Sequence, residues 1–108
     1  MAGRGLFIVM AEMAPEKEEA FNRWYNEEHV PKTLERLPGI LSGKRYKIME
    51  GEEKYRFMAV YEFENYEALE AAYKSEQIKG LIREYNEAFG EGNRYHIRAV
   101  ELKSLIVG

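Results

Sequence analysis

The chain has no cysteine among its 108 residues, which excludes disulfide bonds, thiolate metal sites and a cysteine nucleophile. It also lacks a long hydrophobic run. The apolar stretch Leu6–Met10 is far shorter than the roughly 20 residues of a membrane-spanning helix, and its flanks are not those of a signal peptide. Basic residues number 16 against 19 acidic ones, and a net charge of −3 does not favour a nucleic acid partner. We therefore expect a cytoplasmic protein that binds neither nucleic acid nor a membrane.

Residues that hold metals and phosphates are scarce. The two histidines, His29 and His96, lack the ligand count and spacing of a zinc or iron site, and we interpret His96 as structural or exposed. A haem site needs a histidine placed to ligate iron, which the pair of Trp24 and His29 does not indicate. The glycines are scattered among turns and caps, and no phosphate-binding loop is present. We expect neither a metal nor a cofactor.

What is present is typical of an ordinary globular protein. Hydrophobic residues make up 45% of the chain and charged residues 32%, a balance that allows a compact core. No internal repeat, low-complexity tract or linker interrupts the sequence. We therefore expect residues 1–108 to form a single domain.

Apolar and alternating patterns predict four strands, at residues 6–13, 40–50, 55–63 and 93–107. The first is apolar on alternate and intervening positions alike, which is typical of a strand buried on both faces. The third shows the clearest strand pattern, because aromatic residues and Ala59 alternate with a more polar set of residues, Arg56, Met58, Val60 and Glu62.

Helical patterns fill the two long intervals between these strands. In the first interval, a helix is predicted from about Pro15 to His29, with a break or kink at Pro31 and a short helix beyond it. In the second, Asn65 and Ser75 are predicted to cap two helices, and the second of these ends at Gly90.

This order predicts an α+β, ferredoxin-like βαββαβ fold, in which a four-stranded antiparallel sheet has its first and third strands at the centre. Two helical hairpins cover only one face of such a sheet. The first strand nevertheless has apolar residues on both faces, with Leu6, Ile8 and Met10 on one of them. A large apolar face is a liability on a monomer, so we expect a homodimer that packs sheet against sheet.

The segment Phe21–Pro31 holds the most unusual pattern. At ~100° per residue on an α-helix, Tyr25 and Glu28 lie on either side of Phe21, and His29 lies at the flank of this aromatic face. Glu28 is therefore predicted to be a carboxylate inside a core stripe, which is costly unless a partner neutralises it. Lys17, Arg45 and Arg56 are the candidate ion-pair partners, and a role for Glu28 in orienting or accepting a proton is the alternative.

His29 is the best catalytic candidate, with Tyr25 four residues earlier on the neighbouring helix surface. An imidazole has an ordinary pKa of about 6.5, so it can both take and give a proton near neutral pH. The alternative is a histidine that simply ends a helix, where the dipole favours it. Likewise, Trp24 fits core packing as well as a ligand platform. The predicted substrate-binding residues are Asn22, Trp24, Glu28, Phe57 and Tyr61.

These residues resemble those of the dimeric α/β-barrel superfamily, and especially of its EthD-like group. The resemblance rests on the following segments: Phe21-x-x-Trp24-Tyr25-x-x-Glu28-His29-Val30-Pro31, then Leu37-Pro38-Gly39, Arg45-Tyr46 and Tyr61-Glu62-Phe63. It implies two ferredoxin-like sheets pairing as a dimeric α/β barrel, with a pocket between sheet and helices and an acid–base role for His29. The superfamily includes monooxygenases, cyclases, dehydratases, isomerases and haem-degrading enzymes.

Three functions follow as hypotheses. The first is a cofactor-independent enzyme of cyclase, dehydratase, isomerase or monooxygenase type, which acts on a hydrophobic, oxygenated small molecule through His29. The second is a homodimer that binds or senses a small molecule without turnover. The third is an assembly role, in which the aromatic faces serve dimerisation alone. A pocket lined by His29 and Tyr25 would argue against the third.

Overall fold

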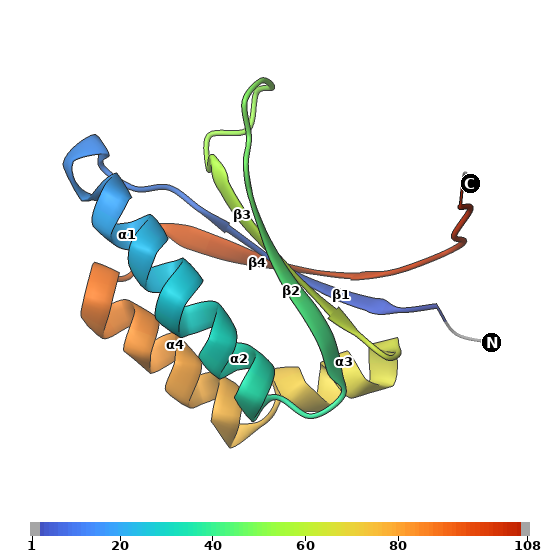
Figure 1. Ribbon diagram of the computed structural model, residues 1–108. Helices are drawn as coiled ribbons and strands as arrows, with labels where there is room; N and C mark the ends of the chain where they lie inside the picture. Colours follow the sequence, from blue (N-terminus) through green and yellow to red (C-terminus); the bar gives the residue numbers. More distant parts are fainter. Residues whose placement is uncertain (1–2, 107–108) are drawn as a thin grey trace.

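The computed structural model describes residues 3–106, which form a four-stranded antiparallel sheet with helices on one face (Figure 1). The strands lie in the order β2-β3-β1-β4. This arrangement confirms the predicted ferredoxin-like α+β fold, with the first and third strands at the centre. The elements in chain order are β1 (Gly5–Ala11), η1 (Pro15–Lys17), α1 (Glu18–Trp24), η2 (Tyr25–His29), α2 (Val30–Arg36), β2 (Ile40–Lys47), β3 (Phe57–Phe63), α3 (Tyr66–Tyr73), α4 (Glu76–Phe89) and β4 (Arg94–Val100).

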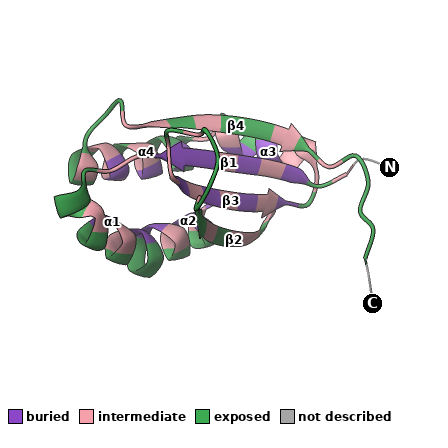
Figure 2. Ribbon diagram, turned by 90° about the horizontal axis from the view of Figure 1, so that it is seen from above, coloured by how far each residue is buried: buried purple, intermediate pink, exposed green. Residues whose placement is uncertain are grey.

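Alternation along the central strands separates two faces of the sheet. Phe7 and Val9 of β1 pair with Tyr61 and Ala59 of β3, and all four face the helices and are buried. Figure 2 shows that buried residues concentrate on β1 and β3, while the edge strands β2 and β4 are more exposed. The core therefore lies between the central strands and the helix layer.

The second helical hairpin follows the capping signals of the sequence. The Asn65 side chain accepts a hydrogen bond from the Ala68 N–H at 2.8 Å, and Ser75 Oγ accepts one from the Ile78 N–H at 3.3 Å. Helix α4 ends at Gly90, whose φ of 88° is readily adopted only by glycine. The predicted caps and stop are confirmed.

A break or kink was predicted at Pro31, and the structure has no break there but a distorted turn directly before it. Helix α1 runs into a π-helical turn, η2, in which the Val30 N–H donates to the carbonyl of Tyr25 five residues earlier, and α2 follows without interruption. Pro31 is the second residue of α2 and follows directly on the π turn, so helical residues precede it. The wider π turn before it thus takes up the distortion that a proline causes inside an α-helix.

All four strands are shorter than predicted: β1 ends at Ala11 instead of Met13, and β2 ends at Lys47 instead of Glu50. Strand β3 begins at Phe57 instead of Tyr55, and β4 ends at Val100, with residues 101–106 outside any strand. Val107, the predicted end of the last strand, lies outside the described residues. No helix within residues 3–106 has the length and apolar character to cross a lipid bilayer.

The sheet face opposite the helices is uncovered (Figure 1). Ile8 lies at its centre, paired with Val60 of β3 on one side and Ile97 of β4 on the other. Ile97 is 39% exposed and its neighbour on the same face, Tyr95, is 37% exposed. This face, which we call the outer sheet face, is therefore apolar and open to solvent in one copy of the chain.

Candidate functional site

A small cavity lies between the helix-facing side of the sheet and the helices. Its volume is about 30 Å³, enough for about two water molecules. One wall comes from η2 and α2, the opposite wall from α4, and the floor from the strands. The lining residues are Phe7, Val9, Tyr25, His29, Thr33, Leu37, Tyr61, Ile78, Leu81, Ile82, Tyr85, Arg94 and His96.

His29 is buried in this wall with only 8% of its surface exposed. The indole of Trp24 stacks on its imidazole, with ring centroids 4.6 Å apart and planes 18° from parallel. The Tyr25 ring packs edge to face with the imidazole, with ring centroids 4.9 Å apart. Burial lowers the pKa of His29 to about 4, against a weaker opposing pull from Glu84. Nδ1 of His29 has no hydrogen-bond partner among the described residues. His29 is therefore a neutral imidazole with a free nitrogen at pH 7.

The π-helical turn determines which residues reach the cavity. A π turn contains more than four residues, so side chains four apart lie nearly above one another. This brings Phe21, Tyr25 and His29 onto one buried face. The same change of phase directs Glu28 to solvent, so its predicted burial in the aromatic stripe is wrong and it needs no ion-pair partner.

Phenol groups supply hydrogen-bond donors inside the cavity. Burial raises the pKa of Tyr61 to about 12 and raises that of Tyr25 well above its usual value, with the Tyr61 phenol adding to the effect on Tyr25. Both phenols are therefore protonated at neutral pH. The Tyr61 hydroxyl is buried without a hydrogen bond of ordinary geometry among residues 3–106, and the side chains of Thr33 and Tyr25 lie near enough to oppose part of the rise in its pKa.

Replacing Tyr61 with phenylalanine is expected to leave the free energy of unfolding unchanged or to raise it by about 1 kcal/mol, because the buried hydroxyl makes no hydrogen bond of ordinary geometry among the described residues. Tyr85→Phe is the matched control. The Tyr85 hydroxyl donates to Asn93 Oδ1 at 2.9 Å, and its loss is expected to cost about 1 kcal/mol. Urea denaturation of both variants measures the difference. Equal destabilisation by the two substitutions would show that the Tyr61 hydroxyl has a partner in solution.

Two half-buried arginines contact the tyrosines of the site. The Arg45 guanidinium lies 4.4 Å from the centroid of the Tyr25 ring, and that of Arg94 lies 3.9 Å from the centroid of the Tyr85 ring. Burial lowers the pKa of both arginines from the usual value. Arg45 stands behind Tyr25, outside the cavity, whereas Arg94 is part of its lining.

The structure separates the predicted site residues into three groups. Tyr25, His29 and Tyr61 line the cavity, and Trp24 lies behind His29 as a stacking partner. The exposed Glu28 is not part of the lining. The remaining two, Asn22 and Phe57, line a separate open groove beside Arg45.

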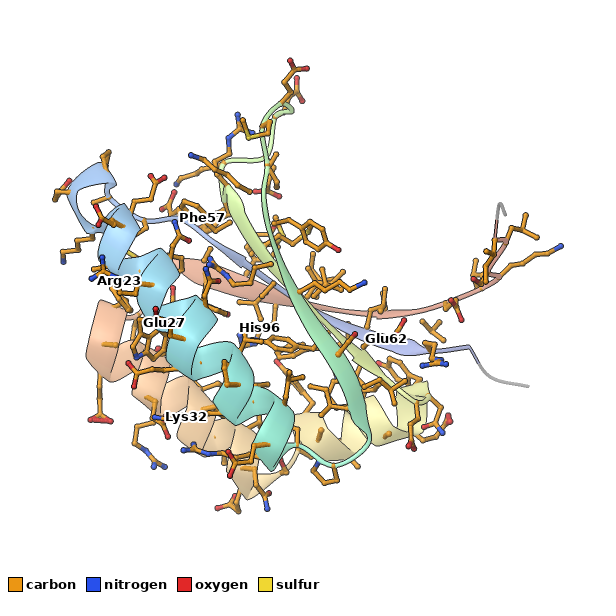
Figure 3. The ribbon with its side chains drawn as sticks, in the orientation of Figure 1. Arg23, Glu27, Lys32, Phe57, Glu62 and His96 are labelled. Atoms are coloured by element: carbon orange, nitrogen blue, oxygen red, sulfur yellow. The ribbon has the colours of Figure 1, made fainter. Side chains whose placement is uncertain are left out.

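Sequence reasoning missed four polar residues of the cavity, Thr33, Tyr85, Arg94 and His96. His96 projects from β4 into the space between sheet and helices (Figure 3). Burial lowers the pKa of this histidine to about 4, with Arg94 adding a smaller effect. Arg94 and His96 are two apart on a strand and so face the same side, a signal that was available in the sequence.

Within the described part of the chain, no group of three or more histidine, aspartate or glutamate side chains is placed to hold a metal ion. Residues 4–103 match the model of a family described as a domain of unknown function, DUF4286. The chain belongs to this family. No curated protein matches the chain in sequence.

Solved structures resemble this DUF4286 chain along almost its whole length. An EthD family protein from Bacillus halodurans has a TM-score of 0.70 and 23% identity, over 94% of this chain and 100% of that one. A monooxygenase from Streptomyces coelicolor, solved with the ligand nanaomycin D, has a TM-score of 0.64 and 13% identity, over 99% of this chain and 94% of that one. The expected resemblance to the EthD-like group is confirmed at the level of the fold.

A third similar structure bears on assembly. A protein from Bacteroides fragilis, described as dimeric with a ferredoxin-like fold and unknown function, has a TM-score of 0.62 and 14% identity, over 92% of this chain and 97% of that one. The DUF4286 chain therefore shares its fold with a protein that is described as a dimer.

Proposed function

We propose that this chain binds a hydrophobic, oxygenated small molecule in the cavity and acts on it as a cofactor-independent enzyme, with His29 as the acid–base residue. The observation that carries the proposal is the state of His29, which is buried, neutral and without a hydrogen-bond partner on Nδ1. A buried polar atom without a partner is uncommon in native proteins and points to a group that a ligand completes.

The geometry supports proton transfer to and from carbon or oxygen. A neutral imidazole takes a proton from an acidic C–H or O–H of the ligand and returns it to another atom in a later step. The oxygen on which negative charge then develops needs hydrogen-bond donors, and the protonated phenols of Tyr25 and Tyr61 supply them. This step is common to isomerases, cyclases and dehydratases, and Trp24 keeps the imidazole in place by stacking.

A second candidate function is binding or sensing without turnover. The small volume of the cavity favours it, because about 30 Å³ does not hold a substrate unless side chains of the lining move. Both functions use the same cavity, and they differ in whether His29 transfers a proton.

Proton exchange at carbon separates the two functions. We expect the protein to speed the exchange of α-hydrogens of an enolisable aryl ketone such as 2-tetralone in deuterated water, followed by NMR. His29→Gln is expected to lower that rate at least about 100-fold, because a positioned general base contributes about 10²–10⁴. Glu27→Gln, on the exposed side of the same π turn, is the control and is expected to leave the rate unchanged.

The pH dependence gives an independent check on the same residue. Because a base must be unprotonated, the exchange rate is expected to rise with pH through about 4 and to level off above it, following the lowered pKa of His29. Exchange that survives in His29→Gln would overturn the catalytic role. Ketone binding without any enzyme-dependent exchange would leave the binding function in its place.

We also propose that the chain works as a homodimer, with the outer sheet faces of two copies packed together. The support is the row of apolar side chains on that face, Ile8, Val60 and Ile97 at its centre, and the dimeric description of a protein that shares the fold. Burying this row removes apolar surface from water, which favours association.

A further inference from the structure

Among residues 3–106, Arg94 is the one charged residue in the lining of the cavity. The two histidines of the lining are neutral at pH 7. Arg94 is the first residue of β4 and lies against α4, where its guanidinium covers the Tyr85 ring and donates a hydrogen bond from Nη1 to Asn86 Oδ1 at 2.8 Å. These contacts position the guanidinium beside the cavity.

The exposed carboxylate of Glu91 attracts the Arg94 guanidinium from beyond ion-pair distance. Within the described residues Arg94 forms no ion pair, and no aspartate or glutamate lines the cavity. Glu84 of α4, whose charge acts on His29, is already paired with Arg36 and Lys32. A half-buried cation is poorly neutralised when its counter-charge is exposed to solvent and does not contact it. In a chain of net charge −3, a positive charge without an ion-pair partner among the described residues is a distinct feature of this cavity.

Arg94 and His96 also form the boundary between the cavity and the surface. Both residues line the cavity, and both line an open hollow of about 220 Å³ at the α4–β4 edge, together with Asn86, Glu91 and Tyr95 among others. Glu91 is exposed in that hollow and forms no ion pair among residues 3–106. A movement of the Arg94 side chain would join the two spaces, which makes room that the cavity alone does not have.

We propose that Arg94 and His96 form an anion-binding entrance to the cavity, and that the ligand is therefore an organic anion whose negative group is held there. The apolar part of the ligand passes between them toward His29, and the negative group stays at the Arg94 guanidinium. A guanidinium binds carboxylate and sulfonate groups through two parallel N–H donors, and His96 adds a neutral donor beside it. The inference rests on the proposed role of the cavity as a ligand site and narrows the ligand to one class.

Two probes of nearly equal shape test the charge requirement. Benzenesulfonate is anionic at every working pH, whereas benzenesulfonamide is neutral at pH 7. The chain has two histidines, so the imidazole C2–H signals of His29 and His96 are resolved and assigned by NMR with one His→Gln variant of each. We expect saturable shifts of the His96 signal with benzenesulfonate and at least about tenfold weaker binding of the sulfonamide.

Arg94→Gln is expected to weaken benzenesulfonate binding at least about tenfold. Arg98→Gln is the matched control, because Arg98 lies on the same strand and the same face, over Tyr73 at 4.4 Å, and does not line the cavity. It is expected to leave binding unchanged. Thermal unfolding shows whether each variant is folded, and Arg94→Lys, which keeps the charge without the paired donors, is expected to lose less affinity than Arg94→Gln.

Three results would overturn the anion entrance. They are an absence of any benzenesulfonate-dependent shift, equal binding of the neutral sulfonamide, and equal loss of affinity in Arg98→Gln and Arg94→Gln. The catalytic proposal is tested separately by proton exchange. If exchange depends on His29 and benzenesulfonate binding does not depend on Arg94, the entrance is wrong and the enzyme stands. If binding depends on Arg94 and no exchange occurs, the entrance is right and the binding function holds.

Discussion

Replacing Ile8 with aspartate is expected to convert the proposed homodimer into a monomer. Ile8 lies at the centre of the outer sheet face, between Val60 and Ile97. A carboxylate at this position would be buried against the same apolar row of the second copy without a partner. The cost of burying such a charge exceeds what the surrounding apolar contacts contribute to association.

Sedimentation velocity at micromolar concentration measures the change. The wild-type chain is expected to sediment as a dimer and Ile8→Asp as a monomer. Gln77→Asp adds the same charge on the exposed surface of α4, away from the sheet, and is expected to remain dimeric. A monomeric wild-type chain, or a dimeric Ile8→Asp chain, would show that the outer sheet face is not the interface.

Acidification from pH 7 to pH 4 is expected to lower the free energy of unfolding, with His29 contributing up to about 3 kcal/mol of the loss. The folded-state pKa of His29 is about 4, below its ordinary value of 6.5. As pH falls through 6.5, the unfolded chain takes up a proton that the folded chain takes up only near pH 4. The stability that neutral His29 contributes is therefore full above pH 6.5 and is lost between 6.5 and 4.

Urea denaturation at a series of pH values, at one protein concentration, measures this slope. His29→Gln cannot take up the proton, so its stability is expected to fall less steeply over the same window. Carboxylates titrate in both proteins, and the comparison removes their contribution. The lowered pKa of His96 acts in the same direction, with a smaller effect because this side chain is partly exposed. Parallel curves for the wild-type and His29→Gln chains would show that His29 is not held neutral by burial.

Most of the fold was predictable from local signals. Three predicted features depend only on residues a few positions away, and the structure has all three. They are the alternation in β3, the N-caps at Asn65 and Ser75, and the end of α4 at Gly90. The strand order followed from the βαββαβ order of the elements, and the apolar character of the first and third strands agreed with it. These features are encoded within short windows, where propensity and periodicity act directly.

The site was predictable only in part, because two of its determinants are not local. The direction of the Glu28 side chain around the helix depends on the π turn. The prediction applied a single α-helical period along Phe21–Pro31, and that period does not describe a π turn. Arg94 and His96 reach the cavity because β4 pairs with β1 and packs near α4, and only the tertiary arrangement brings them opposite His29. Tyr25 and His29 were found because they lie on one helical segment.

The π turn at Tyr25–His29 also affects how this chain is compared with its relatives. Such a turn holds one residue more than an α-helical turn, so a relative with a regular helix here has one residue fewer over the same length. An alignment without a gap would then place every position after the turn one step out of register. Such an alignment would pair His29 with a residue of the relative whose side chain points away from the cavity. A histidine at the equivalent position in space would then be counted as absent. Superposition of the helices, with a single-residue gap at the turn, compares the residues that face the cavity.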